Sequence, residues 1–313
     1  MVDKILEQYE VRKSNKEKTI FIDYLKDRLS QCGYDKENDI KIEEKWKGIL
    51  KTRNIVVGNP EEAEIFITAH YDTCAVIPFP NLLSPTNPVI FWGFQFFLVF
   101  IILFLGVLVA VPVMLLTENA LITYYAFLAT LILLMFQLMI GYRNKHTAND
   151  NTSGIITITR ILEALSPEDR KKICAVYFDN EEKGLFGSSF FAGKHKNVRK
   201  NKLLINFDCV GDGENIVFMA KGKARSDKNY SLLVETLKSG AVNFDGNCLC
   251  KKMKPIMFPS DQANFEKGIG VCALKKSPIG MYAARIHTPF DTKCREENIE
   301  FLSECMVEFV KAL

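Results

Sequence analysis

Apolar and polar residues divide this chain into a mixed body and one long stretch that is almost free of charge. In the body, short apolar runs of strand length alternate with segments in which apolar residues recur every three or four positions, as in an amphipathic helix. The runs predict strands near 54–57, 65–69, 171–179, 202–208 and 216–220, and the periodic segments predict helices within 18–34, 150–165, 184–193, 229–240 and 295–313.

Strands that alternate with helices predict an α/β fold with a mixed, largely parallel central sheet flanked by helices. In such sheets, ligand sites lie beyond the carboxyl ends of the strands. Several of the predicted strands end in an acidic residue or a histidine, which points to chemistry at that edge. The sequence has no internal repeat, low-complexity tract or nucleic-acid motif, so we expect no nucleic-acid partner.

The uncharged stretch has the length and composition of two membrane spans. Between residues 89 and 142 the only charged residue is Glu118. The apolar segments on either side of it each exceed the roughly 20 residues needed to cross a bilayer, and neither has the polar face of a soluble core helix. We therefore expect residues 89–142 to form a transmembrane helical hairpin in a lipid bilayer, inserted between residues 1–88 and 143–313 of one catalytic domain.

Charge next to the hairpin predicts its orientation. Arg143 and Lys145 follow the second segment directly, whereas the connecting turn has no Lys or Arg. The positive-inside rule then places both termini and the catalytic domain in the cytoplasm, and the first 18 residues have no apolar core of signal-peptide length. The nine cysteines include no CxxC pair and fit reduced thiols, although Cys248 and Cys250 leave a zinc–thiolate site open.

Five polar segments carry residue types that bind zinc. His70 and Asp72 face the same side of an extended strand, so the imidazole can bind a metal while the carboxylate accepts its other N–H. Glu181 and Glu182 are adjacent like charges after an apolar strand, which is costly unless a cation or a shared proton compensates them. The other candidates are Asp150 in a polar turn before a helix, Asp208 after an apolar strand, and His287 two residues before a proline.

Each segment alone is also typical of an ordinary strand end or solvated turn. The five segments together, however, indicate a metal site. Two histidines and three carboxylates make five ligands, with one glutamate to spare. Two zinc ions need such a set if one carboxylate bridges them at a separation of about 3.5–4 Å. Each ion then keeps an open position for water and substrate. Cobalt or manganese would suit the same ligand types.

Six ordered motifs resemble those of the co-catalytic di-zinc aminopeptidases: "ITAHYDT", "ANDNTSG", "FDNEEKGLFGSSFFA", "NFDCVGDG", "SDQANFEKGIG" and "RIHTPFDT". That family also includes glutamate-carboxypeptidase-type enzymes, glutaminyl cyclases and silent transferrin receptors. The resemblance spans roughly Asn54 to the carboxyl end without the hairpin. It implies that Asp150 bridges two zinc ions, that Glu182 and His287 complete one site, and that His70 and Asp208 complete the other.

The resemblance also implies a reaction. Glu181 would be the general base and later the acid, Asp72 would orient a ligand, and the peptide bond between Asp150 and Asn151 would be strained or cis. Such a site hydrolyses the first peptide bond of a peptide substrate, because zinc activates water and the free amine is held at the metals. The motifs depart from the family at Thr147 and at "SDQ", where Ser-Asp-His is more familiar.

Other readings of the same residues remain open. A glutaminyl cyclase shares most of the site but works with one zinc ion, and the presence of His70 favours two. A dipeptidase or carboxypeptidase, or a catalytically silent membrane-bound interaction module, are further alternatives, and the sequence leaves the oligomeric state undetermined. We expect His146 and His195 to lie on the surface. The hairpin leads to the hypothesis that the tether selects peptides that arise at the membrane or partition into lipid.

Overall fold

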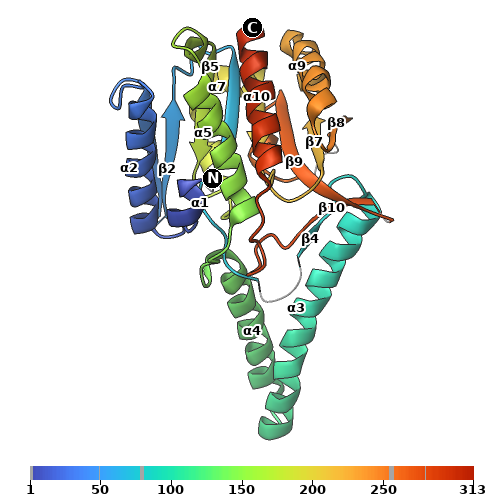
Figure 1. Ribbon diagram of the computed structural model, residues 1–313. Coiled ribbons are helices and arrows are strands. Elements are labelled where there is room, and N and C mark those ends of the chain that lie inside the picture. Colours follow the sequence, from blue (N-terminus) through green and yellow to red (C-terminus); the bar gives the residue numbers. More distant parts are fainter. Residues whose placement is uncertain (1–2, 49, 78–80, 254–256, 279) are drawn as a thin grey trace.

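The computed structural model describes residues 3–48, 50–77, 81–253, 257–278 and 280–313. Two long helices, α3 (Pro88–Thr117) and α4 (Ala120–Ile140), project as a hairpin from a rounded body (Figure 1). The other α-helices of the described residues are α1 (Lys4–Gln8), α2 (Asn15–Gln31), α5 (Gly154–Ala164), α6 (Phe186–Lys194), α7 (Lys196–Asn201), α8 (Gly222–Arg225), α9 (Lys228–Gly240) and α10 (Glu296–Ala312).

One mixed ten-stranded sheet forms the centre of the body. Its strands are β1 (Ile40–Lys47), β2 (Leu50–Val57), β3 (Ile65–His70), β4 (Leu82–Leu83), β5 (Ile173–Phe178), β6 (Leu203–Phe207), β7 (Asn215–Ala220), β8 (Asn247–Lys252), β9 (Gly268–Ser277) and β10 (Gly280–Ala284). The order is β1-β2-β5-β3-β6-β9-β10-β4, with β7 between β9 and β8. The central strands β5, β3, β6 and β9 are parallel, so their carboxyl ends share one edge. The predicted α/β fold is confirmed.

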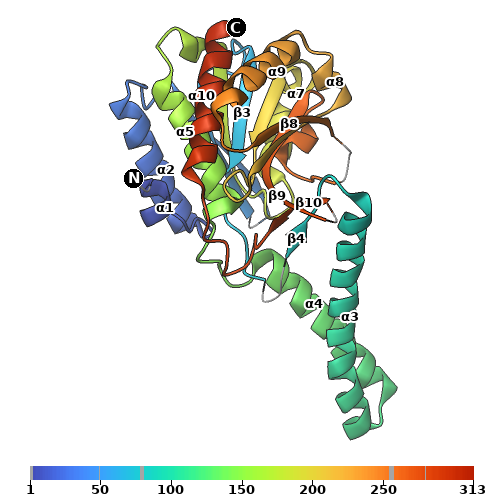
Figure 2. The same cartoon turned by 45° about the vertical axis from the view of Figure 1, so that its right-hand side comes forward.

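Helices cover both faces of this sheet. Helices α2, α5, α9 and α10 pack on one face over the largest apolar core, whereas α6 and α7 pack on the other around Phe191 and Val198 (Figures 1 and 2). A capping box starts α2, because the Ser14 hydroxyl accepts the Glu17 N–H and the Glu17 carboxylate accepts the Ser14 N–H. The core strands are buried along their whole length, which matches their unbroken apolar runs.

The predicted strands and helices of the body are all present, but half of the sheet was not predicted. β1 and β8 contain several lysines, β4 has two residues, β9 contains two glycines and two lysines, and β10 is a five-residue strand that begins with glycine. β1 and β8 are largely exposed edge strands, so they lack the continuous apolar run that identifies β3, β5 and β6. β9 is buried over its first seven residues, but its glycines interrupt the apolar pattern.

The two hairpin helices begin and end within two residues of the predicted hairpin bounds, 89 and 142. In each, a preceding asparagine accepts backbone N–H groups of the first turn, Asn87 for α3 and Asn119 for α4. Glu118 closes the tip in the left-handed conformation with φ 48°. Both helices are long and apolar enough to cross a membrane, and only 6% and 0% of their most apolar windows are buried. They are therefore not core helices of the body.

Candidate metal centre

The sheet edge and two loops bring the predicted site residues together. His70 ends β3, Asp208 follows β6, and the Glu181–Glu182 pair follows β5 after a short turn. Asp150 comes from the irregular turn Ala148–Ser153 that leads into α5, and His287 from the loop after β10. Residues more than 200 positions apart in the chain thus meet at the carboxyl ends of parallel strands, where the sequence predicted a ligand site.

Asp150 lies at the centre of this cluster. One carboxylate oxygen, Oδ1, is 3.2 Å from His70 Nε2, and the other, Oδ2, is 2.9 Å from His287 Nε2. His70 Nε2 is also 3.7 Å from Asp208 Oδ1, and His287 Nε2 is 3.3 Å from Glu182 Oε2. A single carboxylate therefore faces two separate groups of nitrogen and oxygen atoms, one on each of its oxygens.

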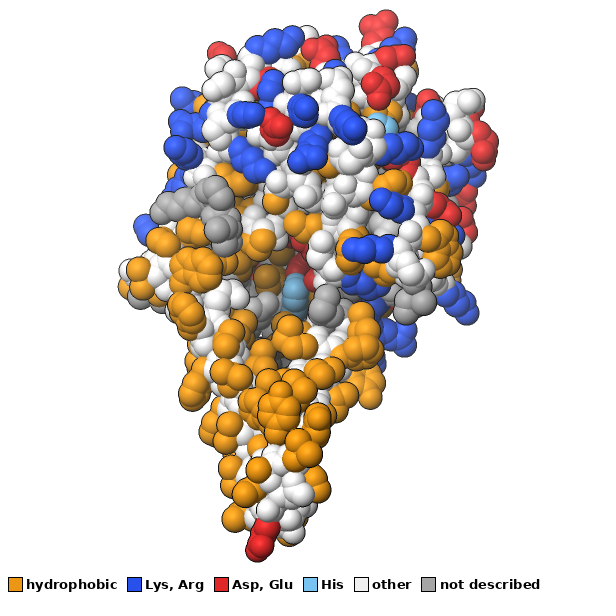
Figure 3. Space-filling model, turned by 180° about the vertical axis from the view of Figure 1, so that it is seen from behind, with side chains coloured by type: hydrophobic (Ala, Val, Ile, Leu, Met, Phe, Trp, Pro, Cys, Tyr) orange, Lys and Arg blue, Asp and Glu red, His pale blue; other side chains and the backbone are white. Residues whose placement is uncertain are grey.

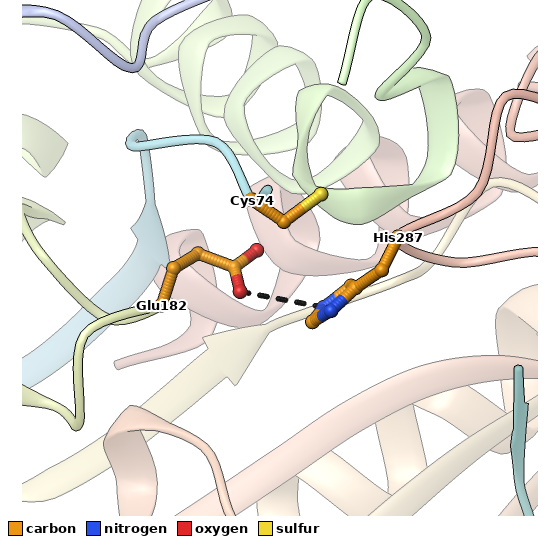
Figure 4. A group of neighbouring side chains, drawn as sticks. All are labelled: Cys74, Glu182 and His287. Carbon is orange, nitrogen blue, oxygen red and sulfur yellow. Dashed lines mark ion pairs between the residues drawn. The ribbon is translucent and has the colours of Figure 1, made fainter. Parts of the chain in front are cut away.

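Glu182 contributes an atom whose bonding is incomplete. Its Oε2 contacts His287, but Oε1 is buried and has no hydrogen-bond partner. The thiol of Cys74 lies beside this pair: a ligand atom from each of Cys74, Glu182 and His287 falls within 4.8 Å of the others (Figure 4). A buried oxygen without a donor is costly, and a bound cation would supply the missing partner.

Asp72 acts on the glutamate pair more directly than on His70. Its Oδ1 accepts the Glu181 N–H at 3.0 Å, and its Oδ2 accepts the Glu182 N–H at 3.3 Å. His70 Nδ1 lies 3.1 Å from the carbonyl oxygen of Asp72 but 3.7 Å from its carboxylate. The contact that the spacing predicted for the carboxylate is thus made by the main chain, and the carboxylate instead fixes the turn that carries both glutamates.

The turn around Asp150 is held from several sides. Asp291 accepts the backbone N–H groups of Asn149 at 2.9 Å and Asp150 at 3.0 Å. Asn151 donates its side-chain N–H to the carbonyl of Phe207 at 2.8 Å, and its side-chain oxygen accepts the N–H of Gly154, the first residue of α5. The peptide bond between Asp150 and Asn151 is cis, which confirms the implied geometry. These contacts tie the turn to β6 and to the loop of His287.

Three residues at the site have left-handed backbone conformations although they are not glycine. They are Asn180 (φ 54°), which precedes the glutamate pair, Cys209 (φ 59°), which follows Asp208, and His287 itself (φ 61°). Such conformations are unfavourable for residues with a Cβ and concentrate where surrounding contacts fix a functional geometry. These three residues lie at the same edge of the sheet as the cluster of candidate ligands.

Burial and charge shift the pKa values of the cluster strongly. Burial raises the pKa of Glu182 to about 8, and it raises that of Glu181 well above the usual range. Burial alone would lower the pKa of His287, but the charge of Glu182 and the bond to Asp150 raise it to about 9. Burial alone would raise the pKa of Asp150, but hydrogen bonds from His287 and His70 lower it instead. Such opposed shifts within one small group are typical of functional sites.

Three further buried charges adjoin the site and were not predicted. Arg12 donates to the carbonyl of Tyr71 at 2.6 Å and to the hydroxyl of Thr152 at 3.0 Å. Asp261, in the "SDQ" motif, is fully buried with both carboxylate oxygens unpartnered, and burial raises its pKa to about 7. Asp291 lies in the motif "RIHTPFDT", but the resemblance to the aminopeptidases gives it no function. A motif search could have found both aspartates, whereas Arg12 lies in a polar segment without any signal.

The remaining histidines and the close cysteine pair lie outside the cluster. His146 is exposed, as predicted, whereas His195 is only partly exposed, because its ring packs against that of Phe191 and its Nε2 lies 2.9 Å from Glu43 Oε1. Cys248 and Cys250 belong to β8, and neither joins any metal-binding group among the described residues.

Solved structures of two kinds of enzyme share the fold. Porphyromonas gingivalis glutaminyl cyclase has a TM-score of 0.57 at 14% identity, covering 97% of this chain and 92% of its own. Bacteroides thetaiotaomicron glutaminyl cyclase bound to N-acetylhistamine has 0.55 at 16%, covering 98% and 94%. The Legionella pneumophila aminopeptidase LapA has 0.52 at 14%, covering 97% and 68%. No curated protein matches the sequence.

The sequence itself matches the model of one protein family. The model of peptidase family M28 matches residues 137–305, which is more than half of the chain. The matched segment begins near the end of α4 and contains Asp150, Glu182, Asp208 and His287. The aminopeptidases and glutaminyl cyclases among its structural neighbours agree with the resemblance of the motifs, and the family implies zinc dependence. The chain belongs to peptidase family M28.

Proposed function

We propose that this protein is a membrane-anchored, zinc-dependent aminopeptidase that removes amino-terminal residues from peptides. One observation carries the proposal: the two carboxylate oxygens of Asp150 face two different histidines, His70 at 3.2 Å and His287 at 2.9 Å. A shared carboxylate between two nitrogen ligands suits two metal ions rather than one. Asp208 would complete the ligand set on the side of His70, and Glu182 the set on the side of His287.

The ligand types and the unpartnered Oε1 of Glu182 fit zinc. When bound, zinc would polarise the scissile carbonyl and lower the pKa of the attacking water. Glu181, whose carboxylate groups with His70 and Glu182 within 4.8 Å, is the base that takes a proton from this water and returns it to the departing amine. The carboxylate of Asp72 accepts the backbone N–H of Glu181 and so holds Glu181 in position.

A glutaminyl cyclase is the second candidate, because the structural match extends over nearly the whole length of the cyclase chains, 92% and 94%. The two reactions differ in substrate: the cyclase acts on an amino-terminal glutamine without releasing an amino acid. A dipeptidase or carboxypeptidase would differ in the chain end that it needs. A silent interaction module would bind peptide without turnover.

The test measures amino acids released by detergent-purified protein from peptides with free and blocked amino termini, together with the bound zinc. We expect two zinc ions, cleavage of free amino termini only, and loss of activity in Glu181→Gln with zinc retained. The exposed Glu168→Gln is the matched control and should retain activity. Release of ammonia from amino-terminal glutamine alone would establish the cyclase, release from the carboxyl end a carboxypeptidase, and absence of zinc the silent module.

The anchor is part of the same proposal. Helices α3 and α4 would span the bilayer as a hairpin, with Arg143 and Lys145 on the cytoplasmic side together with both termini. Protease protection in intact and permeabilised cells tests this orientation. A tag at the carboxyl terminus should be digested only after permeabilisation, and digestion in intact cells would reverse the orientation.

A further inference from the structure

The end of the hairpin and the candidate metal centre share one network of hydrogen bonds. The Val76 N–H donates to the carbonyl of Tyr142 at 2.8 Å, where the chain leaves α4. Asn144 donates its side-chain N–H to the carbonyl of Thr288 at 2.9 Å. The Ile77 N–H donates to the carbonyl of His287 at 2.7 Å. The segment after Asp72, the exit of α4 and the loop of His287 therefore form one hydrogen-bonded unit.

Helix lengths place this unit at the membrane surface. With 21 residues, α4 is about 32 Å long, which equals the roughly 30 Å of a hydrocarbon core. If its tip at Glu118 lies at one surface, Tyr142 lies at the other. The 30 residues of α3 give about 45 Å, so its first turns extend beyond the core and lie beside the body, where Phe91 is buried.

Two aromatic side chains on this unit are exposed to solvent in the protein alone. Phe290, in the loop between His287 and Asp291, is 70% exposed, and Tyr142 is 81% exposed. Phe290 belongs to the loop whose Asp291 holds the backbone of Asp150. Tyrosine is enriched at the membrane interface, and an exposed phenylalanine offers apolar area to the same layer. The exposed side chains of Lys145 and Lys293 flank them in sequence and suit anionic headgroups.

The surface view shows where the centre opens. Acidic and histidine side chains lie at the bottom of a hollow in the body, directly above the apolar hairpin, and apolar side chains border the hollow on the hairpin side (Figure 3). A peptide that reaches this hollow from the bilayer meets apolar surface first and the buried carboxylates last.

We propose that the candidate centre opens at the membrane interface and takes peptides bound to the bilayer, with an apolar portion in the lipid and a free amino terminus in the hollow. Phe290 and Tyr142 form the interfacial rim that holds the opening at this depth. This inference rests on the proposed peptidase function. The free amino terminus is the end of the peptide at which the proposed aminopeptidase acts.

The test compares two substrates with one amino-terminal sequence, a short soluble peptide and the same peptide with an acyl chain at its carboxyl end. Full-length protein is reconstituted in phospholipid vesicles. We expect Phe290→Ser to lower kcat/KM for the acylated peptide roughly threefold to tenfold, because part of one aromatic burial is lost, and to leave the soluble peptide unchanged. Val242→Ser is the control: Val242 is 81% exposed and lies in the short turn Ala241–Asn243 after α9, outside the hairpin and the loops that carry the candidate ligands.

The outcomes separate this inference from the proposed function. Equal loss on both peptides would mean that Phe290 supports the fold of the loop, and no loss on either would mean that it does not contact the bilayer; both overturn the inference. Inactivity of the wild type on both peptides would overturn the proposed function instead. As a measurement independent of turnover, Phe290→Trp should add tryptophan emission that brominated lipids quench, and unquenched added emission would also overturn the inference.

Discussion

A buried ion pair behind the glutamate turn allows a quantitative test of the fold. The ammonium of Lys18 in α2 binds the carboxylate of Asp179, and both side chains are almost completely buried, with 1% and 0% exposed. Lys18 also donates to Asn180 Oδ1 at 3.0 Å, and Asp179 accepts the Arg53 N–H at 2.8 Å. Removing one partner of such a pair leaves an uncompensated buried charge, which costs about 3–5 kcal/mol.

Lys18→Met should therefore lower the melting temperature substantially. At about 2–4 °C per kcal/mol for a domain of this size, the loss corresponds to roughly 6–20 °C. Adding Asp179→Asn removes the unpaired charge and keeps an oxygen for the Arg53 N–H, so the double variant should regain more than half of the loss. Lys16→Met, at an exposed position of the same helix, is the control.

The pH dependence of this variant has a defined sign. Burial raises the pKa of Asp179 above its usual value even with Lys18 opposite it. A carboxyl whose folded pKa is raised destabilises the protein increasingly as the pH rises above its unfolded pKa of about 3.9. The difference in melting temperature between wild type and Lys18→Met should thus narrow as the pH is lowered from 8 towards 5. A difference no larger than that of Lys16→Met, or a double variant as unstable as the single one, would refute the reasoning.

Three further changes probe the site and its supports. Asp291→Ala should weaken zinc binding measured by competition with a chelator, because the N–H groups of Asn149 and Asp150 lose their acceptor; unchanged affinity would show that the turn holds itself. Cys74→Ser should weaken cadmium binding more than zinc binding, because thiolates favour soft ions; equal changes would place the sulfur outside the metal shell. Gly154→Ala should lower the melting temperature, because a Cβ would lie 2.4 Å from the carbonyl oxygen of Phe207; an unchanged melting temperature would mean that α5 shifts freely.

The parts of the fold that the sequence predicts are those with a single local cause. β3, β5 and β6 are continuous apolar runs because both faces of the sheet are covered, and α2 and α10 have regular apolar spacing because one side faces the core. β1 and β8 are different: both contain exposed lysines, and their conformation depends on pairing with a neighbouring strand. Such pairing is a tertiary property, so no local pattern reveals it.

The candidate site also combines residues that a local motif reveals with residues that only the tertiary structure brings together. His70, Asp150 and Glu182 lie in short motifs whose order along the chain was informative, and the structure brings them within a few ångströms of one another. Arg12 reaches the site because the segment before α2 lies against it. The guanidinium of Arg12 bonds to Tyr71 and Thr152, which are far away in sequence. Likewise, the two acceptor bonds of Asp291 depend on the path of the turn around Asp150, which the motif alone does not define.

The position of β3 in the sheet also constrains how the protein is synthesised. Both neighbours of β3, β5 and β6, are encoded after the hairpin, whereas β1 and β2 pair only with each other until β5 is made. While the ribosome translates α3 and α4, β3 is an apolar strand with two open edges, a state that promotes aggregation. The body can close only after the hairpin has left the ribosome, so insertion into the membrane would precede completion of the sheet. If the hairpin inserts as proposed, a delay in insertion should appear as misfolding of the body rather than as a soluble, folded protein.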